Sequence, residues 1–325
     1  MKKFWIIALS ALFLSSSASA VNMVNIHSYL NVPIRIIGLP DFPPFSYYEN
    51  PGREYEFHSI FLAPLKEVLQ KHDVDAYASP VSPEEANDVR ILLIRAKKGD
   101  AEAFIGAYAD TKLFSGLDVI YPAVISNPIH IITLEDTQEK IKNVGDLLKL
   151  RGIACKSEYF SDFVLRKFKE LNISYVDTPF EAYEAVITGK ADYMFGSMYY
   201  NRIMASRYGV GDYLKYSKNP IWNIPFFVAL SKLMPMLSEY KKVLKEEFEN
   251  PDFAMTIKQK ILDAVNEEVD KNIGIVPPSF VQEIEQKYEV TDEENGVEED
   301  AKVSSGHIVE QKIHQKTIDE VLDGI

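Results

Sequence analysis

Cysteine is almost absent from this chain of 325 residues, in which Cys155 is the only one. A single thiol excludes an intrachain disulfide and the zinc motifs that are built from cysteine pairs. The six histidines include no two that are four residues apart, so the helical zinc motif is missing as well. We therefore expect no metal and no cofactor. Cys155 follows Ile153 and Ala154, and this apolar run indicates a buried thiol on a strand.

Positive charge is scarce, because 35 lysines and arginines stand against 48 aspartates and glutamates, for a net charge of −13. The chain has no basic stretch interleaved with aromatic residues, so we expect no nucleic-acid partner. The acidic excess is uneven: residues 283–325 hold thirteen acidic residues and four lysines, a net charge of −9. The rest of the chain is only mildly acidic.

Long apolar runs are missing except at the start. Residues 1–20, MKKFWIIALSALFLSSSASA, combine two lysines, an apolar run and a small-residue end. This order is typical of a signal peptide cleaved near Ala20, so we expect export to the periplasm. The apolar stretch 113–132 is broken by Asp118, Pro122 and Pro128, and we expect no membrane-embedded segment after removal of the signal.

Short apolar runs alternate with helical patterns from residue 33 onward, which indicates an α/β fold. Strands are expected at 33–39, 102–108, 152–155, 173–177, 191–197 and 223–232. Helices are expected at 59–72, 88–99, 161–172, 180–190, 233–249 and 251–269.

Two β-rich segments, 123–133 and 216–227, each contain an Asn-Pro pair and are expected to cross between two lobes. The predicted boundaries follow from these crossings. Lobe 1 comprises 26–126 and 223–272, lobe 2 comprises 127–222, and an acidic C-terminal extension covers 273–325. Within the extension, 291–306 is charged and is predicted to be a partly disordered, solvated linker, and 307–325 has the apolar spacing of a short amphipathic helix.

An aromatic loop follows the first predicted strand, in the stretch IIGLPDFPPFSYYENPG at 36–52. Pro40, Pro43 and Pro44 stiffen this loop, because proline fixes φ and has no N–H. Its rings suit a small-molecule site at the end of a strand. The alternative is that they form a hydrophobic plug, since large aromatic residues mostly bury area.

The order of five stretches resembles the periplasmic solute-binding proteins of family 3, the polar amino-acid binding type with a type II fold. They are FPPFSYYENPG, GDAEAFIGAYADT, VIYPAVISNPIHIIT, VGDLLKLRGIAC and ITGKADYMFGS. The resemblance implies two α/β lobes that close about a hinge on a small solute. It implies delivery of that solute to an ABC-type importer, with sensing as the alternative. It also implies a monomer that is not an enzyme.

Two departures from that family set the expected ligand apart from a standard amino acid. The arginine that clamps the α-carboxylate in the family falls at Phe114 or Ser115, and Lys112 is displaced from that position. The aspartate that binds the ammonium group falls at Ser197. The loop 156–160 precedes a helix, so its N–H groups are candidates to receive an anion.

The candidate ligand-binding residues come from both expected lobes. They are Phe42, Tyr47, Tyr108, Asp110, Phe114, Phe160, Ser197 and Trp222. Phe42 and Phe114 are expected to stack on or enclose the ligand, Asp110 and Ser197 to orient it by hydrogen bonds, and Trp222 to lie near the hinge.

Two other functions stay open. The same fold serves as a periplasmic sensor or interaction protein, and the acidic extension favours this reading slightly. An enzyme is less favoured, because Glu158 and Asp110 are the only carboxylates placed in the expected cleft for general acid–base work. The chain also lacks a phosphate-binding loop and a nucleophile turn.

Overall fold

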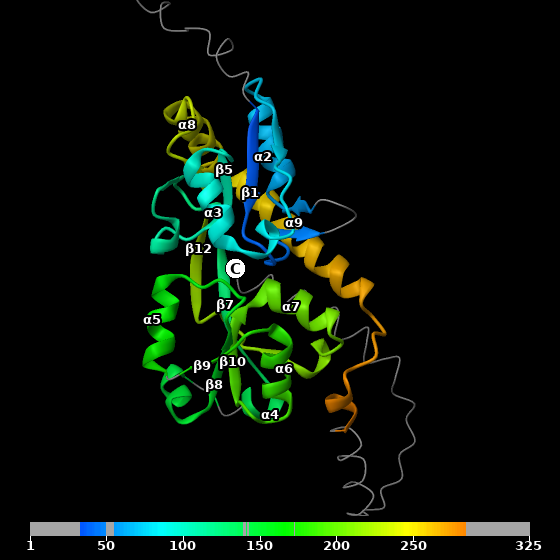
Figure 1. Cartoon of the computed structure of the whole chain (residues 1–325). Helices are drawn as coiled ribbons and strands as arrows, with labels where there is room; N and C mark the ends of the chain where they lie inside the picture. The colour runs from blue at the N-terminus through cyan, green and yellow to red at the C-terminus, as the bar shows by residue number, and fades with distance from the viewer. Residues whose placement is uncertain (1–32, 50–54, 139–140, 142, 172, 284–325) are drawn as a thin grey trace, which may run out of the picture.

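A computed structural model describes residues 33–49, 55–138, 141, 143–171 and 173–283, which form two α/β lobes stacked end to end (Figure 1). The predicted signal peptide, the linker at 291–306 and the helix at 307–325 lie outside the described residues. No helix within these ranges is long and apolar enough to cross a membrane.

Lobe 1 is built on a sheet in which β1 lies between two parallel neighbours, β4 and β5. Its strands are β1 (Ile34–Gly38), β4 (Ala76–Ala78), β5 (Ala103–Ala107) and β6 (Leu117–Val119), with a separate hairpin of β2 (Tyr47–Glu49) and β3 (Glu56–His58). Its helices are α2 (Leu62–Gln70), α3 (Val89–Lys98) and α8 (Leu237–Phe248), with short 3₁₀ turns at Glu85–Asn87 and Lys112–Phe114.

Lobe 2 repeats this plan, with β8 between its parallel neighbours β9 and β10. Its strands are β8 (Gly152–Cys155), β9 (Ser174–Val176), β10 (Tyr193–Ser197) and β11 (Lys215–Tyr216). Its helices are α4 (Glu135–Gln138), α5 (Asp162–Glu170), α6 (Pro179–Ile187) and α7 (Met198–Arg207), with 3₁₀ turns at Val144–Lys149 and Gly211–Tyr213.

Two long strands cross between the lobes, as the sequence predicts. β7 (Ile125–Thr133) and β12 (Trp222–Ser231) are antiparallel to each other where residues 222–226 face 125–129. From Phe227 onward β12 pairs with β5 of lobe 1 instead, and its register shifts between Phe227 and Val228. β7 continues into lobe 2 beside β10. The lobes are therefore joined by one continuous pair of strands.

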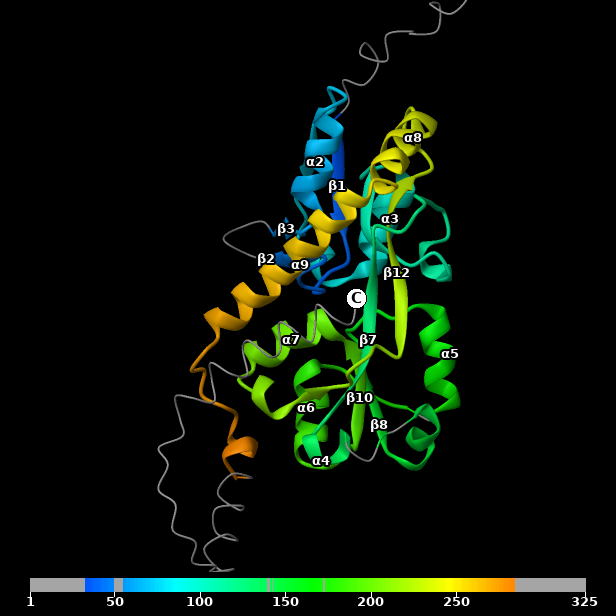
Figure 2. The same ribbon diagram turned by 180° about the vertical axis from the view of Figure 1, so that it is seen from behind.

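The last long helix, α9 (Pro251–Lys271), reaches from lobe 1 to lobe 2 (Figure 2). It packs on α8 at one end and on α7 at the other. The Arg207 guanidinium on α7 pairs with Glu268 on α9 at 2.7 Å. Beyond the helix, the Phe280 ring lies 5.7 Å from Phe180 on α6, and Val281 is fully buried. Residues 273–283, which the sequence assigned to the extension, thus include a segment packed on lobe 2.

Two glycines bring β1 and β5 close together where the aromatic loop begins. A Cβ on Gly38 would lie 2.8 Å from the carbonyl oxygen of Ile105, and one on Gly106 would lie 2.8 Å from the Leu39 side chain. Gly106 also has φ +106°, which L residues rarely adopt. Small residues at these positions fix where residues 39–46 leave the sheet.

We expect Gly106→Ala to lower the free energy of unfolding by at least about 2 kcal/mol, because backbone strain and a clash with Leu39 add together. Gly189→Ala is the matched control: its φ is also positive, at +70°, but no atom lies within 4 Å of the added Cβ. The control should cost about 1 kcal/mol. Urea unfolding measures both, and equal losses would show that the contact with Leu39 contributes nothing.

Candidate functional site

The aromatic loop at residues 39–46 is held by its own hydrogen bonds. The Phe42 N–H donates to the Ser46 carbonyl at 2.8 Å, and the Ser46 N–H donates to the Phe42 carbonyl at 3.0 Å. The Ser46 hydroxyl donates to the Leu39 carbonyl at 2.6 Å. Pro43 and Pro44 lie inside this closed loop, where their fixed φ limits its motion. The loop therefore presents the Phe42 side chain in a defined direction.

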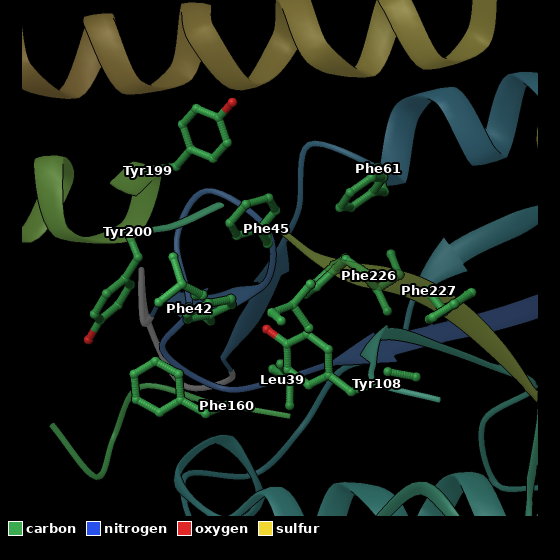
Figure 3. Packing of buried hydrophobic residues seen from close by; sticks show 14 of the residues in the cluster. Leu39, Phe42, Phe45, Phe61, Tyr108, Phe160, Tyr199, Tyr200, Phe226 and Phe227 are labelled. Carbon is green, nitrogen blue, oxygen red and sulfur yellow. The ribbon is translucent and has the colours of Figure 1, made fainter. Parts of the chain in front are cut away.

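Phe42 lies at the centre of rings that come from both lobes (Figure 3). Its ring centroid is 5.4 Å from that of Phe45, in the same loop of lobe 1, and 6.4 Å from that of Phe226 on β12. It is 5.2 Å from Tyr200 on α7 and 6.1 Å from Tyr159, which precedes α5. These separations are typical of favourable aromatic pairs.

We call this group the interlobe aromatic cluster and add Tyr199, whose ring lies 6.0 Å from Phe45. Phe42, Phe45 and Tyr200 have no exposed surface. The cluster therefore joins the loop of lobe 1 to lobe 2 through close contacts between side chains of the chain itself.

A chain of buried hydrogen bonds also runs from lobe 1 to lobe 2, and we call it the polar chain. The region where the two lobes meet through these contacts is called the junction below. The side-chain amide of Asn127 on β7 donates through Nδ2 to the Tyr108 hydroxyl at 3.3 Å, and its Oδ1 accepts from the Ser197 hydroxyl at 2.6 Å. The Glu158 carboxyl accepts from the Ser197 N–H and, at 3.0 Å, from the Asn201 amide. All five residues are at most 2% exposed. Polar groups from lobe 1, a crossing strand and lobe 2 thus meet in one place.

Glu158 is the only acidic member of the polar chain. Burial raises the pKa of its carboxyl to about 8, although the hydrogen bonds from Ser197 and Asn201 act in the opposite direction. Among the described residues no lysine or arginine forms an ion pair with it. The carboxyl is therefore mainly protonated at neutral pH.

A third set of contacts, the Asp110 latch, joins the loop after β5 to the start of α5. The Asp110 carboxylate accepts from the Phe163 N–H at 2.8 Å, and the Thr111 hydroxyl accepts from the Asp162 N–H at 3.2 Å. The Lys112 N–H donates to the Asp162 carboxylate at 3.4 Å. A carboxylate at a helix N-terminus interacts favourably with the helix dipole. The latch therefore links lobe 1 to lobe 2 near the protein surface, outside the buried polar chain.

The structure brings four of the eight candidate residues to the junction: Phe42, Tyr108, Asp110 and Ser197. The other four pack on rings outside the interlobe aromatic cluster. Tyr47 stacks on His58 at 5.3 Å, Phe114 packs on Phe104 at 5.7 Å, Phe160 packs on Phe168 at 4.8 Å, and Trp222 packs on Phe195 at 5.0 Å.

Several residues at the junction were not among the candidates: Asn127, Tyr159, Tyr200 and Asn201. Asn127 belongs to the Asn-Pro pair that marked the crossing strand, so its position was visible in the sequence. Tyr200 and Asn201 follow the strand that ends at Ser197, on a helix that the sequence pattern did not reveal. No group of three metal-ligating side chains is present in the described ranges.

No protein-family model and no curated protein sequence matches this chain. Solved structures do match. The amino acid ABC transporter substrate-binding protein AbpA from Streptococcus pneumoniae, bound to L-arginine, has a TM-score of 0.52 at 14% identity over 73% of this chain and 96% of that one.

Two receptor domains match to a similar extent. The AvGluR1 ligand-binding domain in complex with glutamate has a TM-score of 0.55 at 16% identity, over 72% of this chain and 96% of that one. A histidine kinase sensor domain with similarity to periplasmic binding proteins has a TM-score of 0.50 at 13% identity, over 77% of this chain and 99% of that one. The fold expected from the resemblance is confirmed.

We expect the stability of the protein to fall as the pH rises from 6.5 to 8, because the folded form holds a proton on Glu158 that the unfolded chain releases above its ordinary pKa of 4.5. The expected loss is about 1–2 kcal/mol. Burial lowers the pKa of His130 below 6.5, so this residue has the opposite effect on stability, and its effect fades as the pH rises above 6.5. Denaturant unfolding at several pH values measures the slope.

The matched variant for this measurement is Glu158→Gln, which keeps the size of the side chain and removes its titration. Its stability should be nearly constant from pH 6.5 to 8. An equal slope in the variant and the wild type would assign the pH dependence to another group.

Proposed function

We propose that this chain, which has the two-lobed type II periplasmic-binding-protein fold, is a binding protein that takes a small polar solute between its lobes. The observation that supports this most is the polar chain, in which hydrogen-bonding groups from both lobes and a crossing strand converge. Ligand sites usually combine an apolar surround with a few convergent polar groups. Uptake through an ABC-type importer is the process we assign to it.

The expected solute is not a standard α-amino acid. Phe114, one of the two residues that match the position of the family's carboxylate-clamping arginine, packs on Phe104. Arg90, Arg95 and Arg207 pair with carboxylates outside the junction. A solute with hydroxyl, amide or amine groups suits the hydroxyls of Ser197 and Tyr108, which each make one hydrogen bond in the polar chain, better than one that requires a bidentate arginine.

An enzymatic role is not part of the proposal. Glu158 accepts hydrogen bonds on both carboxyl oxygens, and Asp110 caps the start of α5. A general acid or base must reach a proton of the substrate, and these contacts occupy both candidate groups. The solved neighbours described above are binding or sensor domains.

The location that we assign is the periplasm, with the mature chain beginning near Val21. This rests on the signal-peptide pattern at 1–20. A monomer is assigned on the resemblance to monomeric solute-binding proteins.

A second candidate function is that of a periplasmic sensor or interaction protein. The specific observation in its favour is that the aromatic cluster and the Asp110 latch already join the two lobes through the chain's own side chains. A fold that is held together in this way can present a stable surface to a protein partner. The histidine kinase sensor domain among the matching structures has the same fold.

Thermal unfolding of the chain from Val21 onward, recorded with amino acids, opines, organic acids, polyamines and short peptides, tests solute capture. A true ligand should raise the midpoint, by an amount that corresponds to about 2.7 kcal/mol at a concentration 100 times the dissociation constant. Ser197→Ala should weaken the binding of that ligand by roughly five- to tenfold, because one hydrogen bond is lost.

Ser206→Ala is the control, since that hydroxyl donates to the Ile203 carbonyl on α7, away from the polar chain. Its ligand affinity should equal that of the wild type. If no compound changes the midpoint, solute capture is rejected in favour of the second candidate. A protein partner that is lost on deletion of residues 290–325 would then support the sensor or interaction role.

A further inference from the structure

Phe42 is the one member of the aromatic cluster whose ring contacts two rings of lobe 2, Tyr159 and Tyr200. On its other side it contacts Phe45 and Phe226. The ring has no exposed surface, so both lobes are needed to cover it. Separation of the lobes would expose an apolar ring to water, which is unfavourable in proportion to the area uncovered.

The ring is separated from the polar chain by single intervening residues. Its lobe 2 partners, Tyr159 and Tyr200, are the immediate sequence neighbours of Glu158 and Asn201, which belong to the polar chain. On the lobe 1 side, Tyr108 of the polar chain packs on Phe226 at 5.8 Å, and Phe226 is also a partner of Phe42. On either side, therefore, a single residue separates the Phe42 ring from a member of the polar chain.

We propose that Phe42 is a tethered occupant of the space between the lobes, an autoinhibitory contact through which the chain holds itself closed. The loop that carries the ring is fixed by its own hydrogen bonds and prolines, so the ring leaves only when the lobes part or the loop moves as a unit. A solute that binds the polar chain must first displace it. The closed arrangement rests on the contacts alone, whereas the displacement by a solute rests on the proposed function.

Two further contacts favour the same closed arrangement. The Asp110 latch joins the lobes near the protein surface, with a hydrogen bond of 2.8 Å to the Phe163 N–H. On the other face, the Arg207–Glu268 pair and the packing of α9 on α7 connect helices of different lobes. Phe42 differs from both because it is apolar and fully enclosed, and salt does not screen its contribution.

A tethered occupant has a measurable effect on affinity. When only a fraction of the molecules can accept a ligand, the apparent dissociation constant rises by the inverse of that fraction. If the ring is displaced in about one molecule in a hundred, an intrinsic affinity is weakened about 100-fold. Removal of the ring should therefore open the lobes and also lower the apparent dissociation constant toward its intrinsic value.

The test is the distance between the lobes, measured by pulsed electron paramagnetic resonance on the full chain. Spin labels are attached to Lys98→Cys on α3 and Lys169→Cys on α5, both exposed, in a Cys155→Ala background. With Phe42 unchanged, the two labels should show one short distance. In the Phe42→Ala variant, most molecules should show a longer distance between the labels. Benzene, added as the probe, should fill the cavity and restore the short distance.

Phe61→Ala is the matched control, because Phe61 is also buried but packs on Phe45 and Phe226. It should keep the short distance while losing stability. The proposal is overturned if Phe42→Ala keeps the short distance, or if Phe61→Ala opens the lobes to the same extent. If Phe42→Ala does not fold, by circular dichroism, Phe42→Leu replaces it, and a distance unchanged in that variant overturns the proposal equally.

Discussion

The enclosure of the Phe42 ring between the lobes is the constraint on which the rest of the junction depends. To reach Tyr159 and Tyr200, the loop must leave β1 at a fixed point, and the absence of side chains at Gly38 and Gly106 makes this possible. Once the lobes meet there, the polar groups beneath lose contact with water. They must then satisfy one another, which the hydrogen bonds of the polar chain accomplish.

Much of the fold could be predicted from the sequence, because most helices bury one face and expose the other, and the central strands β5, β8 and β10 are short, fully buried apolar runs. The helices at α2, α3, α5 and α9 and the crossing strands β7 and β12 are confirmed at the expected places. Helix α7 was missed because its buried residues, Tyr199 to Ala205, nearly surround it, so it lacks an apolar stripe. Strand β4 is only three residues long, too short for a visible alternation.

The candidate site was harder to predict, since a sequence places a residue at the end of a strand but not the surface that it faces. Tyr108 directly follows β5 and Ser197 ends β10, and both lie at the junction. Phe114 is also near a strand end, yet its ring turns into the core of lobe 1. The contact of Phe42 with Tyr200 joins residues far apart in the chain, and no local pattern encodes such a pair.

Helix α9 gives the molecule a mechanical property that a two-strand hinge lacks. β7 and β12 alone would let one lobe rotate freely about the other, but α9 spans the gap on another side and continues to Phe280, which is packed on α6. The lobes cannot rotate apart without pulling this segment loose or carrying it along. Opening of the lobes must therefore move the segment around Phe280 and Val281 relative to at least one of them.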